Sequence, residues 1–281
     1  MNSVSSRNDV LVSVNDLPDA VNGGAQLLDA RWRLGEEPGA GYTRYLEGHL
    51  PGARFLDLEK VLCGPVDDPL LGRHPLPSAE QLAAGLGALG IDPERPIVVY
   101  DEPGSFAAAR AWWVLTWAGL SVGVLDGGIT AWTAADGGLV SGPAGPVEPT
   151  QVTLETGLLP TLTADDVAGF DGIVMDVRAP ERYRGEIEPI DRVAGHIPGA
   201  VNRPVTGFWD ENGLLPTAEK LDELLDLPAD RPVAVYCGSG VSAAQVLLAL
   251  ATLGIEAALY PPSWSGWSAD PARPVAVGDQ A

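Results

Sequence analysis

The sequence predicts an α/β protein of two domains, each built on a mostly parallel sheet with helices on both faces. Short apolar runs rich in β-branched residues alternate with helical patterns along the chain, which is typical of parallel sheets covered on both sides. The two halves also resemble each other: residues 27–31 match residues 174–178, and residues 48–53 match residues 195–200 at the same offset. The chain is therefore predicted to be an internal duplication.

Two further matches set the domain boundaries. Residues 96–101 match residues 232–237, and residues 126–132 match residues 261–267, but this second offset is shorter by about eleven residues. The difference predicts an insertion in the first half, around residues 63–77. A stretch dense in glycine and proline, at 141–149, favours a linker. We expect domains at about 8–140 and 158–275, joined by residues 141–157.

The second half gives the clearest individual elements, because its apolar runs are short and flanked by turn residues. The predicted strands are near residues 173–177, 200–203, 233–236 and 257–260. The predicted helices are near residues 163–168, 217–225 and 242–253. Ligands of open α/β sheets bind at the carboxyl ends of the strands, so these ends are where a site is expected.

Composition and charge exclude several classes of function. The chain has 281 residues, 46% of them hydrophobic and 20% charged, as expected of a globular protein. No apolar run approaches the roughly 20 residues that a membrane span needs. The first residues lack the pattern of a secretory signal, so we expect a cytoplasmic protein. A net charge of −21 argues against binding to nucleic acid.

Cysteine and histidine are scarce. The two cysteines, Cys63 and Cys237, are far apart, and the chain has three histidines. Neither a disulfide framework nor the ligand spacing of a metal site is present, and no cofactor is expected. Cys63 lies in a loop-like context, and we interpret it as a bystander.

The second cysteine ends a predicted buried strand and opens a tight loop into a helix. The loop after Cys237 consists of Gly238, Ser239, Gly240, Val241 and Ser242. Backbone N–H groups of such a loop converge on one point, and the following helix adds partial positive charge there. That setting favours the thiolate, which is the nucleophilic form. We therefore expect a reactive sulfur accessible to a substrate; the alternative is a buried, inert cysteine.

The motifs together resemble those of the tandem-domain rhodanese sulfurtransferases. They are an Asp-x-Arg strand end at 176–178, a Gly-His-Ile-Pro-Gly-Ala turn at 195–200 and the Cys-Gly-Ser-Gly-Val-Ser loop at 237–242. The resemblance covers nearly the whole chain and implies two rhodanese-like domains. It also implies that the first domain has lost its cysteine, and Asp101 stands at that position. We expect this domain to be catalytically silent.

The reaction implied by the resemblance is sulfur transfer through a persulfide on Cys237. The cysteine would take sulfur from a small anionic donor and pass it to cyanide, a thiol or a thioredoxin-like dithiol. Loops that read Cys-Gly-Ser-Gly resemble those of enzymes that use 3-mercaptopyruvate, which is the favoured donor. Thiosulfate remains the second candidate.

The resemblance also implies roles for other side chains. Arg178 and Arg182 match the pair that binds the anionic donor, although each could instead form an ion pair with a nearby carboxylate. Ser239 is expected to assist proton movement near the sulfur, with His49 as a relay. The family places an aspartate upstream of that histidine, but this chain has none at 39–42. A role in holding the Gly-His-x-Pro-Gly turn is the alternative for His49.

Two other functions are alternatives to sulfur transfer. A phosphatase or arsenate reductase on the same fold needs an arginine at the sixth position after the cysteine, and that position is Ala243. A non-catalytic persulfide carrier or binding module remains the alternative. In addition, Pro261 and Pro262 replace a usual glycine turn, and we expect this change to alter donor access.

Overall fold

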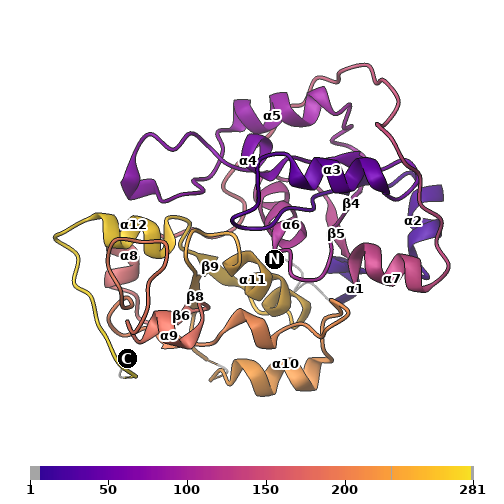
Figure 1. Ribbon diagram of the computed structural model, residues 1–281. Coiled ribbons are helices and arrows are strands. Elements are labelled where there is room, and N and C mark those ends of the chain that lie inside the picture. Colours follow the sequence, from indigo (N-terminus) through magenta and orange to yellow (C-terminus); the bar gives the residue numbers. More distant parts are fainter. Residues whose placement is uncertain (1–6, 229, 280–281) are drawn as a thin grey trace. The chain divides into compact units, whose positions relative to one another are not determined.

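The computed structural model describes residues 7–228 and 230–279 (Figure 1). The chain forms two compact units, and neither is continuous in sequence. Unit 1 holds the described residues of Met1–Gly64, Leu76–Leu159 and Asp210–Leu215. Unit 2 holds those of Pro65–Pro75, Pro160–Trp209 and Pro216–Ala281.

Unit 1 contains a five-stranded sheet with the strand order β1-β5-β4-β2-β3, and all its strand pairs are parallel. The strands are β1 (Leu11–Val12), β2 (Gln26–Asp29), β3 (Arg54–Phe55), β4 (Ile97–Tyr100) and β5 (Val122–Leu125). Its helices are α1 (Arg7–Val10), α2 (Leu17–Asn22), α3 (Ala40–Glu47), α4 (Leu58–Val61), α5 (Ala79–Ala88), α6 (Ala107–Trp117) and α7 (Gly128–Ala134).

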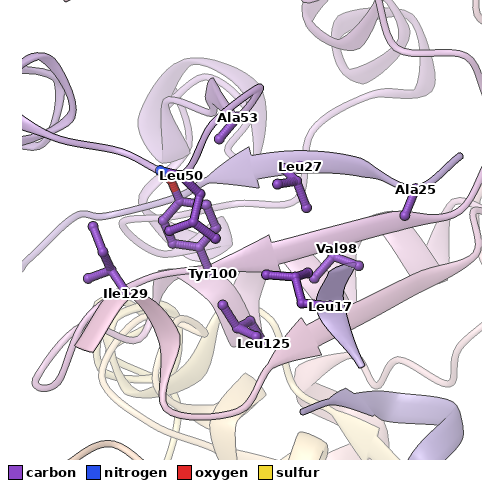
Figure 2. Packing of buried hydrophobic residues seen from close by; sticks show 9 residues of the cluster. All are labelled: Leu17, Ala25, Leu27, Leu50, Ala53, Val98, Tyr100, Leu125 and Ile129. Atoms are coloured by element: carbon purple, nitrogen blue, oxygen red, sulfur yellow. Dashed lines mark hydrogen bonds between the residues drawn. The ribbon is translucent and has the colours of Figure 1, made fainter. Parts of the chain in front are cut away.

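The central strands of unit 1 are buried on both faces, as parallel strands usually are. Because successive side chains point to opposite faces, Leu27, Val98 and Tyr100 lie on one side. Figure 2 shows them packed with Leu17 of α2 and Ile129 of α7. The alternate residues, such as Leu28 and Val99, are fully buried on the other side.

Unit 2 repeats the arrangement with four parallel strands in the order β7-β6-β8-β9. These are β6 (Ile173–Asp176), β7 (Val201–Asn202), β8 (Val233–Tyr236) and β9 (Ala257–Leu259). Its helices are α8 (Ala164–Ala168), α9 (Pro180–Tyr183), α10 (Ala218–Leu225), α11 (Ala243–Thr252) and α12 (Ser263–Ala269), with 3-10 turns η1 (Pro69–Leu71) and η2 (Val205–Gly207). The predicted α/β fold is confirmed, and α11 packs along β8 and β9 (Figure 1).

The insertion anticipated from the unequal offsets has an informative position. Its core, Pro65–Pro75, belongs to unit 2 although both flanks belong to unit 1. Turn η1 packs against α12, and Gly72 lies so close to that helix that an added Cβ would be 2.5 Å from the carbonyl oxygen of Pro262. The insertion thus brings its polar residues to unit 2.

Candidate active site

The loop after β8 holds the cysteine as the sequence suggested. Residues Cys237 to Val241 are buried, Ser242 is half-buried, and α11 begins at Ala243. The N–H group of Gly240 points to the Sγ atom of Cys237 at 3.1 Å. Gly240 has φ 81°, a left-handed conformation that costs a non-glycine residue strain. This glycine is therefore needed to aim its amide at the sulfur.

The exposure of the cysteine differs from the expectation. Cys237 is 1% exposed and the neighbouring Ser239 is 6% exposed, so the sulfur is not open to solvent. The expectation of an accessible sulfur is wrong for this conformation.

Helix α12 contributes the hydroxyl group of its first residue, Ser263. The Oγ atom of Ser263 accepts a hydrogen bond from the Cys237 N–H at 3.2 Å, donates to the carbonyl of Tyr260 at 3.0 Å and lies 4.0 Å from the sulfur. Ser263 has φ 53°. Of the two left-handed glycines in the matching turn of unit 1, Gly127 and Gly128, only the second is reproduced, at Ser263, because Pro262 has φ −62°. Ser263 is fully buried beside the cysteine.

The histidine that contacts Ser239 is His74, from the insertion. Its Nδ1 atom lies 2.8 Å from the Oγ atom of Ser239, and both side chains are buried. His49, expected as the relay, belongs to unit 1, where its Nδ1 bonds to the Tyr45 carbonyl and its ring stacks on Tyr45. His49 therefore holds its turn, and the geometry replaces it with His74 as the partner of Ser239.

Arg178 is engaged by groups of the protein itself. Its Nε and Nη2 atoms bond to Asp176, Nη2 also donates to the Gly195 carbonyl at 2.6 Å, and Nη1 lies 3.3 Å from Glu188. The guanidinium also lies over the ring of Trp264, 4.6 Å from its centroid. These contacts do not place Arg178 to bind a donor directly, contrary to the expectation.

Arg31 of unit 1 makes the same kinds of contact as Arg178. Arg31 bonds to Asp29 through Nε and Nη2 and donates to the Gly48 carbonyl at 2.7 Å. The arrangement is therefore present also in the half where Asp101 stands at the position of the cysteine. Both arginines tie the strand end to the Gly-His-x-Pro-Gly turn.

Arg182 lies beside the loop that follows Cys237, within a small network of charged side chains. It donates to both carboxylate oxygens of Glu188, at 3.1 and 2.6 Å, and to Asp191 at 3.3 Å. Arg73 of the insertion binds the other oxygen of Asp191. Burial opposes ionisation of Glu188, but hydrogen bonds from Arg182 and backbone N–H groups hold its pKa below its usual value. Burial raises the pKa of Asp191, and the two arginines only partly offset this effect.

Both arginines of this network lie against Gly238, the residue after the cysteine. A Cβ added to Gly238 would be 3.3 Å from Nη2 of Arg73 and 3.5 Å from Nη1 of Arg182. A glycine at this position thus lets two guanidinium groups approach the backbone beside the sulfur.

The matching loop of unit 1 carries a carboxylate. Asp101 accepts a hydrogen bond from the Ala108 N–H at 2.9 Å, and burial raises its pKa to about 6. The backbone of the two loops corresponds closely: the Asp101 carbonyl accepts from Ile129 and the Cys237 carbonyl accepts from Trp264, each at 2.9 Å. The difference between the units therefore lies in the side chains.

Residues 7–228 and 230–279 contain no group of three or more His, Cys, Asp or Glu arranged to hold a metal ion. Over the same residues, no helix is both long and apolar enough to cross a bilayer.

Arg73, His74 and Ser263 were thus missed from the sequence. Arg73 and His74 lie in the insertion that the unequal offsets predict. An insertion that is present in only one of two repeated halves is a signal that its residues have a function of their own. For Ser263 the signal was a serine at the position of Gly128.

Comparisons with known proteins agree with this geometry. The Rhodanese-like domain matches residues 13–135 and again residues 161–270. A Mycobacterium tuberculosis protein named as a thiosulfate sulfurtransferase is 44% identical over 98% of this chain and 99% of its own. The 3-mercaptopyruvate sulfurtransferase of Escherichia coli is 37% identical, with 89% of this chain and 91% of that protein covered.

A solved structure shows the same fold. The crystal structure of SseA, a 3-mercaptopyruvate sulfotransferase from Escherichia coli with the rhodanese fold, matches with a TM-score of 0.80 and 34% identity. The match covers 90% of this chain and 98% of that one. With two matched domains and these relatives along its length, the chain belongs to the rhodanese family and is a sulfurtransferase.

Proposed function

We propose that this enzyme moves sulfane sulfur from a small anionic donor to a thiol or cyanide through a persulfide on Cys237. The observation that carries the proposal is the 3.1 Å contact between the Gly240 N–H and the Sγ atom, at the carboxyl end of β8. A backbone N–H group that points at the sulfur stabilises negative charge there, both in the thiolate and in the persulfide anion. The start of α11, immediately after the loop, adds to this stabilisation.

The chemistry has two balanced steps. The Cys237 thiolate attacks the sulfur of 3-mercaptopyruvate, the carbon–sulfur bond breaks, and its electron pair stays on carbon. The mercapto proton ends on that carbon, so that pyruvate leaves and the enzyme holds a persulfide anion. In the second step, cyanide attacks the outer sulfur to give thiocyanate and the free thiolate. A thiol acceptor would instead leave as its own persulfide.

Ser239 and His74 are suited to handle the proton in the first step. Their 2.8 Å contact forms a buried hydroxyl–imidazole pair, and Ser239 is two residues from Cys237. General acid–base groups of this kind contribute about a hundredfold or more to a rate. In this proposal Ser239 touches the substrate and His74 supplies or accepts the proton.

Two observations support 3-mercaptopyruvate as the favoured donor, with thiosulfate next. The loop reads Cys-Gly-Ser-Gly and contains no basic residue, whereas a dianion would gain from cations there. Arg182, with a side chain 15% exposed, is suited to bind a single carboxylate. Relatives named for each donor exist, so both belong in the test. A thioredoxin-like acceptor and a cytoplasmic location stay predictions from the sequence.

Intact mass spectrometry tests the proposal directly. The protein is incubated with 3-mercaptopyruvate or with thiosulfate, and a gain of one sulfur, about 32 Da, is expected in the wild type. The gain should disappear in Cys237→Ser and persist in Cys63→Ser, the matched control. Cyanide should remove it and release thiocyanate. If neither donor produces an adduct, the proposal is wrong, and a non-catalytic binding module becomes the better interpretation.

A further inference from the structure

Ser265 of α12 binds the backbone beside each member of the pair formed by Ser239 and His74. Its N–H group donates to the carbonyl of Gly238, the residue before Ser239, at 3.0 Å. Its Oγ atom accepts a hydrogen bond from the N–H group of Arg73, the residue before His74, at 3.2 Å. A single residue therefore joins the cysteine loop to the insertion, one position ahead of each side chain in the pair.

The hydroxyl group of Ser265 has a fixed orientation. Because the N–H group of Arg73 is the donor in its contact with Oγ, the hydroxyl hydrogen is left for the carbonyl of Pro262, 3.1 Å away. The serine is 8% exposed, and a hydrogen bond in such a setting is stronger than one in water. The Oγ atom is thus a firm attachment for the backbone of the insertion.

Two glycines let the insertion come close enough for this bond. A Cβ added to Gly72 would be 2.8 Å from Oγ of Ser265. A Cβ added to Gly266 would be 2.6 Å from the carbonyl oxygen of Leu70. A larger residue at either place would push turn η1 away from α12. The close packing therefore serves to hold the backbone of the insertion against the first turn of α12.

Unit 1 fastens its matching segment in another way. Residues 210–215 belong to that unit although they come from the second half of the sequence, and the N–H group of Leu215 binds the carboxylate of Asp126 at 2.9 Å. Unit 2 has Pro261 at the position of Asp126, and the side chain of proline accepts no hydrogen bond. Ser265 thus provides the acceptor that Pro261 lacks.

We infer that Ser265 is a positioning residue for sulfur transfer, which sets the distance between Ser239 and His74 by holding the backbone beside both of them. The inference rests on the proton transfer proposed above for that pair. The contact now measures 2.8 Å, and a shift of about 1 Å would break it. Misplacement on this scale can cost about a hundredfold in rate. Ser265 acts through the pair and not on the donor.

The rate of persulfide loading at saturating 3-mercaptopyruvate, followed by rapid quenching and intact mass spectrometry, tests this role. Ser265→Ala removes the acceptor and should slow loading about tenfold, less than the roughly hundredfold loss expected for His74→Ala, because packing still holds the insertion near α12. Ser265→Thr keeps an acceptor oxygen and should load faster than Ser265→Ala. Thr130→Ala is the matched control, since Thr130 stands at the position of Ser265 in unit 1. Its loading should equal that of the wild type.

Two results distinguish positioning from general damage to the fold. In the His74→Ala background, Ser265→Ala should slow loading by less than about twofold, because the pair is already broken. Discharge of the persulfide by cyanide, which needs no proton, should stay near wild type in Ser265→Ala. A further loss of about tenfold in the His74→Ala background, or an unchanged loading rate in Ser265→Ala, would overturn the inference.

The imidazole nitrogen signals of His74, measured by NMR, give a readout that needs no turnover. Ser265→Ala and Ser239→Ala should move these signals in the same direction, since both weaken the contact of the ring with a hydroxyl group. Thr130→Ala should leave them in place. Unmoved signals in Ser265→Ala would contradict the inference. Absence of any persulfide in the wild type would instead refute the proposed function, and the nitrogen signals would still decide whether Ser265 positions the pair.

Discussion

Ser263 and Gly128 stand at matching positions of the two units and have the same φ, 53°. For glycine this conformation carries no penalty, but for serine it costs about 1 kcal/mol or more. Gly128 could not carry a side chain, because its Cβ would lie 2.2 Å from the Asp101 carbonyl oxygen. At Ser263 the strain is offset by hydrogen bonds to the Cys237 N–H and the Tyr260 carbonyl. Strain retained beside the proposed nucleophile indicates a functional constraint.

Two substitutions at Ser263 should separate the effect of its backbone strain on stability from the effect of its hydroxyl group. Ser263→Ala keeps the strain and leaves the buried Cys237 N–H without its partner, which should lower the free energy of unfolding by about 1–3 kcal/mol. Ser263→Gly also loses the hydroxyl but relieves the strain, so it should be more stable than Ser263→Ala by about 1 kcal/mol. Chemical denaturation of both variants measures this difference.

The same two variants test whether the hydroxyl acts on the sulfur. With Oγ 4.0 Å from Sγ, we expect both to load persulfide more slowly than the wild type. Normal loading in both variants would show that the hydroxyl serves only the backbone.

The contact between His74 and Ser239 predicts coupled kinetic effects. Because the two side chains form one buried pair, His74→Ala and Ser239→Ala should each lower kcat with 3-mercaptopyruvate about a hundredfold. The double variant should lose little more than the worse single one, since either change breaks the same pair. Multiplicative losses would instead mean independent roles. His49→Gln, which disturbs the turn of unit 1, should lower stability more than it lowers kcat.

The elements of the fold were predictable because their signals are local. Strands β6 and β8 appear as short apolar runs at 173–176 and 233–236. Each run also has a matching run in the first half of the chain, which supports its assignment as a strand. The partner of Ser239 could not be found in this way. His74 and Ser239 are 165 residues apart, and the offsets reveal that an insertion exists but not which unit it joins.

The role of Arg178 illustrates a second limit. An Asp-x-Arg motif has the same sequence whether its arginine binds a donor or ties a strand end to a turn. Only the contacts of Arg178 with Asp176 and Gly195, together with their repetition at Arg31, distinguish the two. A motif that makes the same contacts in both units, with and without the cysteine, indicates a structural role.

The glycine that aims its amide at the sulfur should resist substitution. Gly240→Ala forces an alanine to φ 81°, which should lower the free energy of unfolding by about 1–2 kcal/mol. Persulfide loading should fall further than this loss explains, because the N–H at 3.1 Å from Sγ changes direction. Gly199→Ala is the control, since Gly199 has φ 84° with nothing near its missing Cβ. Loading in that variant should match the wild type.

The duplicated arginines predict similar losses of stability in both units. Arg178→Lys and Arg31→Lys each replace a fork that grips a carboxylate and a carbonyl with a single point charge. We expect each to lower the free energy of unfolding by about 1.5–3 kcal/mol, measured by denaturation with urea. Arg178→Lys should also reduce activity, because it loosens the strand end that precedes Arg182. Unchanged stability with a raised donor KM would restore Arg178 as a direct ligand.

The carboxylate that replaces the cysteine in unit 1 makes stability depend on pH. Burial raises the pKa of Asp101 from 3.8 to about 6, so between these values the folded state binds more protons than the unfolded state. Its contribution to the free energy of unfolding therefore falls as the pH rises. Above pH 6 the charged form costs up to about 3 kcal/mol, at about 1.4 kcal/mol per pKa unit.

Asp101→Asn removes this cost and can still accept the hydrogen bond from Ala108. The variant should exceed the wild type in free energy of unfolding by up to about 3 kcal/mol at pH 7.5, and by about half as much at pH 5, when measured by denaturation at both values. Asp171→Asn, at an exposed carboxylate, provides the comparison and should show no such trend. A gap for Asp101→Asn that stays constant or widens at pH 5 would show that the unit 1 loop accommodates the ionised carboxylate, and that the loss of the cysteine there carried no electrostatic cost.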